Sequence, residues 1–198
     1  ILNNLMEDDG NLYHSYQKGR KSVPGFLDDY AFTAMAFLDV FTLTRDESWV
    51  KKSQLLVEFA IKNFFDGDKG FFWYTGEKSH DLVARKKDII DNVVPSANSV
   101  MASVLFRLGK ITLTSEYTGM SKKMVLRLEE SIMKYLSLFS NWACVYQYFA
   151  FPFYEVVVSG SKTDEKLFRL FGHYYPAQIL IKKKKKSELP VFKDRFKP

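Results

Sequence analysis

The fold is decided by the stretch Gly25-Phe26-Leu27-Asp28-Asp29-Tyr30-Ala31-Phe32, which places two adjacent carboxylates between a glycine turn and an apolar run. From 27 to 44 apolar residues recur at helical spacing, and Asp28 and Asp29 supply the negative charge that a helix N-terminus favours. The stretch therefore predicts a helix with both carboxylates in its first turn. Because neighbouring helix positions diverge by about 100°, at most one of the two points into a given pocket.

Further helices follow in antiparallel pairs. A second helical pattern covers 49–65 after a short polar loop, so the first two helices form a hairpin. A third helix is expected to open at Pro95-Ser96 with Ser96 as its cap, and a fourth to cover 116–140. Repeated hairpins of this size bury their inner faces by stacking into a solenoid or by closing into a toroid.

Strand patterns interrupt and follow these helices. The aromatic run 71–75 is expected to be a strand, with a partner strand at 81–86 across a turn at 76–80. A fifth helix is expected at 141–151. Beyond it, a strand at 155–160, a helix at 164–171 and a strand at 177–181 predict a small βαβ unit with a right-handed crossover.

The pattern as a whole predicts a mainly α protein with a short β-hairpin insertion and two parts. Residues 1–153 form a helical-hairpin domain and residues 154–198 a small C-terminal α/β extension. With 46% hydrophobic and 16% aromatic residues, the chain has enough apolar side chains for a substantial core. Because it opens at Ile1, without a helix start of its own, we expect a fragment of a longer protein.

Charge and cysteine content narrow the functional classes. The formal charge of +6 falls to +1 without the five lysines of 182–186, so we expect a solvated or edge-guarding tract and no nucleic-acid partner. No apolar run is long enough to span a bilayer, so no membrane association is expected. The single Cys144 excludes an internal disulfide and is expected to be a buried small hydrophobe. A soluble protein of the reducing cytoplasm fits these features.

The first candidate site is the start of the helix at 27. Asp28 and Asp29 are candidate catalytic carboxylates for acid-base chemistry, and the alternative is that both complement the helix N-terminus. Arg85 could clamp a ligand carboxylate, phosphate or hydroxyl in bidentate fashion. Its alternative is a salt bridge to Asp88 or Asp91.

The second candidate site is the start of the helix at 96. Because both helices begin with a cluster of polar residues, we expect the two clusters to line one shared pocket. Asp91, Ser96 and Asn98 cluster where a helix start offers free backbone N–H groups, although Ser96 is first of all a cap. Trp73 could supply an aromatic platform for a sugar face, although aromatic strand residues more often pack. No nucleotide-binding, hydrolase or zinc-protease motif is present and the histidines lack ligand spacing, so neither a cofactor nor a metal is expected.

These features together resemble the YyaL-type family of thioredoxin-domain-containing proteins, which includes the spermatogenesis-associated thioredoxin-like proteins. The matching segments run in family order along nearly the whole chain: Leu12-Tyr13-His14-Ser15-Tyr16 with Gly19, Pro24-Gly25-Phe26-Leu27-Asp28-Asp29-Tyr30-Ala31, Gly70-Phe71-Phe72, Asp91 with Pro95-Ser96-Ala97-Asn98-Ser99, Glu155-Val156-Val157-Val158-Ser159-Gly160, and Leu189-Pro190. Where the family usually has glycine this chain has Ala97, which puts close backbone approach at that point in doubt.

The resemblance implies that the chain is the C-terminal part of a longer protein. Such a protein would have an N-terminal thioredoxin-like domain and an (α/α)6 toroid similar to sugar epimerases and six-hairpin glycosidases, with a central polar pocket. Two function classes follow. One is a carbohydrate-active enzyme, epimerase-like or hydrolase-like, that acts on a sugar or small polar metabolite. The other is a non-catalytic binding or scaffold module in contact with the thioredoxin-like domain. Such a module would have an exposed apolar patch, and its polar clusters would be used entirely in internal salt bridges.

Overall fold

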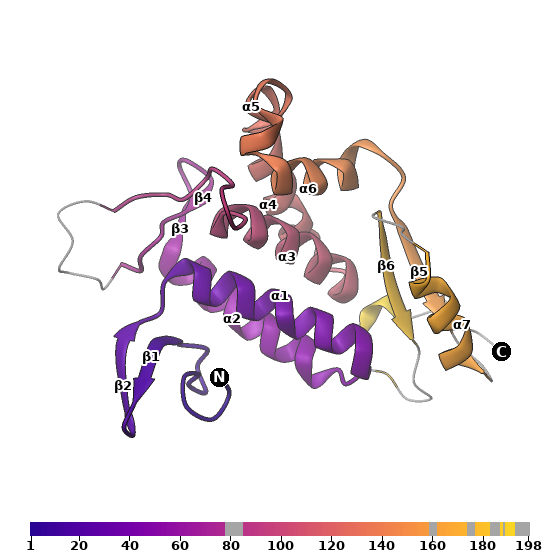
Figure 1. Cartoon of the computed structure of the whole chain (residues 1–198), viewed down its shortest axis with the longest axis horizontal. Coiled ribbons are helices and arrows are strands. Elements are labelled where there is room, and N and C mark those ends of the chain that lie inside the picture. The colour runs from indigo at the N-terminus through magenta and orange to yellow at the C-terminus, as the bar shows by residue number, and fades with distance from the viewer. Residues whose placement is uncertain (78–84, 159–161, 174–176, 183–186, 188, 193–198) are drawn as a thin grey trace.

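Two stacked helical hairpins form the body of the protein. The computed structural model describes residues 1–77, 85–158, 162–173, 177–182, 187 and 189–192. Helices α1 (Leu27–Thr44) and α2 (Ser48–Phe64) form the first hairpin, and α3 (Ala97–Thr112) and α4 (Ser115–Leu126) form the second. Helices α1 and α3 pack side by side and start at the same end of the molecule (Figure 1). The predicted mainly helical fold with repeated hairpins is confirmed.

The helix starts follow the predicted local chemistry. Helix α1 has the predicted bounds, and the Asp29 carboxylate accepts a hydrogen bond of 2.8 Å from the backbone N–H of Phe26, which precedes the helix. Helix α1 is terminated by Arg45, which has a left-handed φ of 63° and donates its N–H to the Phe41 carbonyl. Helix α3 is capped by the Ser96 hydroxyl, which accepts from the N–H of Ser99 at 3.2 Å.

The predicted helix at 116–140 is wrong in its length. The chain instead forms α4, a short α5 (Glu129–Lys134), the 3₁₀ turn η1 (Leu136–Leu138) and then α6 (Ser140–Ala150). A tertiary contact sets the start of α6: the Leu138 carbonyl accepts from the N–H of Asp91 at 2.9 Å, and the Asp91 carboxylate accepts from the N–H of Asn141 at 2.8 Å. These bonds fix a new helix start at Ser140.

Two antiparallel strand pairs lie near the start of α1 (Figure 1). Strands β1 (Tyr13–Gln17) and β2 (Arg20–Pro24) form a hairpin that was not predicted, with Lys18 and Gly19 both at positive φ in its turn. Strand β3 (Phe65–Asp66) pairs with β4 (Phe71–Phe72), so the predicted strand at 71–75 is shorter than expected. The predicted partner strand at 81–86 and turn at 76–80 lie largely outside the described residues.

The C-terminal part contains the predicted βαβ unit at the other end of the hairpins (Figure 1). Strand β5 (Tyr154–Val158) pairs in parallel with β6 (Gln178–Lys182), and α7 (Thr163–Phe171) connects them. A last turn, η2 (Pro190–Phe192), follows. Most of the lysine tract at 182–186 lies outside the described residues.

One continuous core joins the two predicted parts. It is centred on α3, most of whose residues are buried, and it includes side chains of α1, α2 and α6. Strand β6 and turn η2 add Ile179, Ile181, Val191 and Phe192 to the same cluster. The division at 153 stays a prediction. Among the described residues, no helix combines the length and apolar character that crossing a bilayer requires.

The prediction for Cys144 is wrong, because its side chain is exposed. Helix α6 turns Trp142 and Val145 into the core, and Cys144 lies on the side of the helix that faces outward. Apolar sequence neighbours do not bury a helical residue that lies on the opposite side of the helix.

Candidate functional site

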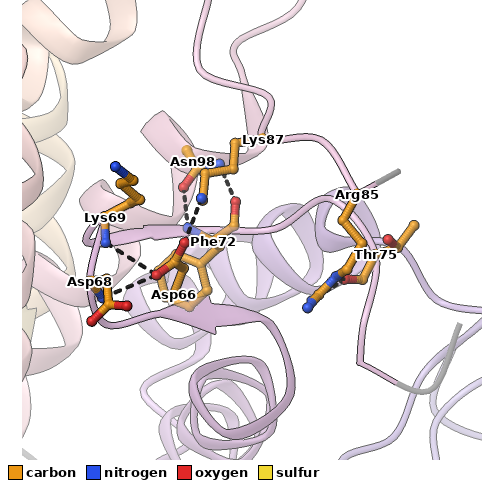
Figure 2. A network of polar contacts seen from close by, with 8 residues as sticks. All are labelled: Asp66, Asp68, Lys69, Phe72, Thr75, Arg85, Lys87 and Asn98. Carbon is orange, nitrogen blue, oxygen red and sulfur yellow. Dashed lines mark hydrogen bonds and ion pairs between the residues drawn. The ribbon is translucent and has the colours of Figure 1, made fainter. Parts of the chain in front are cut away.

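The starts of α1 and α3 are linked by the chain segment that runs from β4 to Tyr74. The Tyr74 carbonyl accepts from the N–H of Leu27 at 2.9 Å. Two residues earlier, the Asn98 side chain accepts from the N–H of Phe72 at 2.8 Å and donates to its carbonyl at 3.0 Å. Each helix start therefore anchors the same segment, as Figure 2 shows for Asn98 and Phe72.

Asp29 serves the helix start and the N-terminal hairpin. Besides capping Phe26, its carboxylate lies 3.0 Å from His14 Nδ1 on β1. Both contacts are internal, so the structure gives Asp29 the capping role that was the alternative to catalysis.

Asp28 points to a different set of neighbours. Its carboxylate hydrogen-bonds with the Tyr74 hydroxyl, and burial raises its pKa above the usual 3.8. The Tyr74 hydrogen bond opposes this rise, whereas the negative charges of Asp88 and Asp29 add to it. Burial and the Asp28 charge raise the pKa of Tyr74 to about 12, so the phenol remains protonated at neutral pH and donates to Asp28.

Aromatic and cationic groups surround this carboxylate. The rings of Phe26 and Tyr74 are stacked with centroids 5.2 Å apart, and the His14 ring meets Phe26 edge-on at 5.1 Å. The Lys86 ammonium lies 5.1 Å from the centroid of the Tyr74 ring. The start of α1 thus combines a half-buried carboxyl group with a phenol, a ring stack and an ammonium.

Asp91 connects the start of α3 to the start of α6. One carboxylate oxygen accepts from the N–H of Ser96 at 2.9 Å and from the Ser99 hydroxyl at 2.7 Å. The other accepts from the N–H of Asn141 at 2.8 Å, at the beginning of α6. The side chain is buried, and these contacts hold α3 and α6 together rather than presenting a free carboxylate.

Ser96 and Asn98 are likewise bonded within the fold. The Ser96 hydroxyl donates to the Ile89 carbonyl at 3.0 Å in addition to capping α3. The Asn98 amide also donates to the Asp88 carbonyl at 2.8 Å. Both side chains are buried, so the start of α3 is a structural network that organises residues 88–91.

Arg85 and Trp73 belong to a second network, part of which Figure 2 shows. The Arg85 guanidinium donates to the Thr75 carbonyl at 2.7 Å and lies 5.0 Å from the Trp73 ring centroid. The Lys87 ammonium lies 3.4 Å from the same centroid and 2.6 Å from the Asp66 carboxylate. Arg85 and Lys87 therefore share the Trp73 ring, while Lys86 lies over the Tyr74 ring.

Two expectations for these residues change. Within the described residues Arg85 makes no ion pair with Asp88 or Asp91, so the expected salt bridge is wrong; its Nε and Nη2 donate to the Thr75 carbonyl instead. Trp73 contacts two cationic side chains instead of offering an open platform.

Three cavities lie away from these networks. Among the described residues, these three cavities lie between α1, α3 and β6, between α3, α4 and α6, and beside Tyr30, and the predicted site residues line none of them. In the described part of the chain, no group of His, Cys, Asp and Glu side chains is arranged to hold a metal ion.

Sequence reasoning missed Tyr74, Lys86 and His14 as neighbours of the candidate carboxylates. In an extended chain successive side chains point to opposite sides, so Lys86 and Tyr74 would be expected on sides opposite to Arg85 and Trp73, and this signal could have indicated Tyr74. His14 could be placed only through the β1–β2 hairpin, which was not predicted.

The fold and these networks define a mainly helical protein built of stacked hairpins. Several known proteins are similar to it in sequence. Over 89 residues, or 44% of the chain, it is 39% identical to spermatogenesis-associated protein 20 of Rattus norvegicus and 37% identical to that of Homo sapiens. It is also 27% identical over 125 residues to an uncharacterised protein of Caenorhabditis elegans.

These matches show homology to spermatogenesis-associated protein 20 across less than half of the chain. The matched segment spans 11% of the length of the mammalian proteins and 17% of the nematode protein. No family model matches the chain.

Proposed function

We propose that the start of α1 binds a small polar ligand such as a sugar and that Asp28 exchanges a proton with it. The observation that carries this proposal is the half-buried Asp28 carboxyl, bonded to Tyr74 and beside Asp88. A raised pKa brings a carboxyl group closer to the range where it works as acid or base near neutral pH. Asp29 and Asp91, in contrast, are occupied by helix starts.

The proposal extends to the architecture that the resemblance implies. Parallel α1 and α3, flanked by their hairpin partners, would form part of the inner ring of an (α/α)6 toroid completed by a longer protein. The start of α1 would then border a central cavity. The ring pair of Phe26 and Tyr74 supports a carbohydrate ligand, because sugars bind against aromatic faces beside carboxylates.

The test is a thermal-shift screen of monosaccharides and sugar phosphates on the full-length parent protein, using wild type, Asp28→Asn and Asp29→Asn. A ligand that binds the native state raises the melting temperature in a concentration-dependent way. We expect at least one sugar to do so in the wild type and in Asp29→Asn, and its effect to be lost in Asp28→Asn.

Asp29→Asn is the matched control, since it removes the neighbouring charge of the same helix turn. Equal ligand shifts in wild type and Asp28→Asn would exclude Asp28 from the site. If no sugar or sugar phosphate shifts the wild type at millimolar concentration, the carbohydrate proposal fails.

A second candidate, a non-catalytic module that packs against a thioredoxin-like domain, is favoured by an exposed apolar surface. Two loops joined by the Asp91 to Leu138 backbone bond carry this surface. Its members, exposed by 45–96%, are Ile90, Val93, Val94, Leu136 and Leu138. Apolar clusters of this kind mark protein contact sites.

This candidate is tested by titrating the thioredoxin-like domain of a homologous full-length protein into this chain. Binding is expected for the wild type and for the control Leu43→Glu, which changes an exposed apolar residue on α1, and not for Val93→Glu. Absence of binding to the wild type, or equal binding by Val93→Glu, would contradict a docking role.

A further inference from the structure

One cavity lies away from the start of α1, where the C-terminal unit meets the helices. It has a volume of about 430 Å³ and lies between α1, α3, α6 and β6. Its size falls within the range of small-molecule pockets, roughly 300–1,000 Å³. None of the residues around Asp28 contributes to it, so its ligand would be independent of the function proposed above.

Arg107 on α3 is the charged group of this cavity. Its side chain is only 19% exposed, and Nη1 alone carries its bonds, to Asp39 at 2.8 Å and to the Met35 sulfur at 2.8 Å. In the part of the chain that the structure describes, nothing bonds to Nε or Nη2. Those donors form the flat edge of the guanidinium that binds carboxylates in bidentate fashion.

The Asp39 contact does not neutralise this edge. Asp39 bonds Nη1 only, and its side chain is 59% exposed, so solvent screens its charge and the Nε–Nη2 edge stays open. Arg107 and His173 line the cavity, and no Asp or Glu side chain is among the described residues that line it. The open Nε–Nη2 edge of Arg107 is therefore the charged group that a ligand in this cavity meets, and it favours an anion.

The remaining walls are apolar with a few hydrogen-bonding groups. Ile179 and Leu180 of β6 are buried, and Met35 lies beside them in the lining. Thr42 and Gln178 add polar atoms. A bare inorganic anion would leave the apolar wall unused, so the cavity suits an anion with a hydrocarbon body.

We propose that this cavity binds a small carboxylate with an apolar body, its carboxylate paired with the Nε–Nη2 edge of Arg107 and its hydrocarbon part against Met35 and Ile179. Hexanoate is a suitable probe, with hexanol as its uncharged counterpart and inorganic phosphate as an anion without a hydrocarbon body.

Calorimetric titration of the full chain with hexanoate tests the proposal. We expect saturable binding to the wild type, at least about tenfold weaker binding to Arg107→Gln, and weaker binding of hexanol and phosphate. Asp39→Asn breaks the same ion pair but keeps the guanidinium, so its affinity should equal or exceed that of the wild type.

Gln178→Glu is a second variant, which adds a negative charge to the lining without touching Arg107, and it should weaken hexanoate binding about tenfold. Circular dichroism checks that each variant is folded. Equal loss of binding in Arg107→Gln and Asp39→Asn, unchanged binding in Gln178→Glu, or no saturable hexanoate binding to the wild type would overturn the proposal. Asp28→Asn should bind hexanoate normally, which separates this site from the sugar proposal.

Discussion

Asp91 is the single residue on which two helix starts depend. Replacing it by alanine leaves the N–H groups of Ser96 and Asn141 without their acceptor inside the protein. Each buried donor left unpaired costs about 1–3 kcal/mol, so Asp91→Ala should lower the free energy of unfolding by about 3 kcal/mol or more. Urea denaturation followed by circular dichroism measures this loss.

The control for this prediction is Ser99→Ala, which removes one partner of the same carboxylate. It should cost about 1 kcal/mol. If Asp91→Ala is no more destabilising than Ser99→Ala, Asp91 does not join the two helices in the way described.

Asp28 should make stability depend on pH. Its pKa is raised in the folded protein, so the protein binds this proton more tightly when folded than when unfolded. The resulting stabilisation is present below the ordinary pKa of 3.8 and is lost as the pH rises through the folded value. Asp28→Asn should therefore exceed the wild type in unfolding free energy at pH 7 and match it near pH 3. A constant difference across both pH values would contradict the assignment.

The sequence could identify the polar clusters at the starts of α1 and α3 but not the interaction partner of each side chain. Asp28 and Asp29 have the same chemistry, and they differ only because one turns back to Phe26 while the other meets Tyr74 from a distant segment. Asp91 was predicted to contact a ligand because its partner Asn141 lies fifty residues further along the chain. Local patterns do not record such tertiary partners.

At the scale of the helix, the orientation of α6 determines the reactivity of the chain's single thiol. Cys144 faces solvent while Trp142 and Val145 face the core. A water-soluble disulfide reagent such as dithionitrobenzoate should therefore release one equivalent of thiolate chromophore from the native protein. The same stoichiometry in urea is the control, and a thiol that reacts only after unfolding would show that α6 has the opposite face inward.

The elements that sequence reasoning predicted well have local start signals. Helices α1 and α3 begin with a capping carboxylate and a capping serine that can be read from the sequence. The region 116–140 has no local signal for its break, because the α6 start is fixed by Asp91. The β1–β2 hairpin did carry a local signal, the Lys18-Gly19 turn between two short β-prone segments, although it was not predicted.

At the scale of the whole molecule, the C-terminal unit shares its apolar core with the helical hairpins. Val191 is fully buried in the cluster that contains α1, α2 and α3, whereas Leu167 belongs to a smaller cluster with Val158 and Leu180. Two independent domains would unfold separately, but a shared core couples their unfolding. The tryptophans distinguish these cases, because Trp49, Trp73 and Trp142 all precede residue 154.

We expect Val191→Ala to destabilise the helical part although the change lies in the C-terminal extension. Deleting buried methyl groups there should lower the unfolding free energy by about 2 kcal/mol and shift the urea transition monitored by tryptophan fluorescence. Leu167→Ala, in the separate small cluster, should shift that transition less. If Val191→Ala leaves the fluorescence transition unchanged while the protein remains folded, residues 1–153 unfold as an independent domain and the division at 153 holds. A shift larger than that of Leu167→Ala instead makes the contact of β6 and η2 with α3 part of one cooperative core.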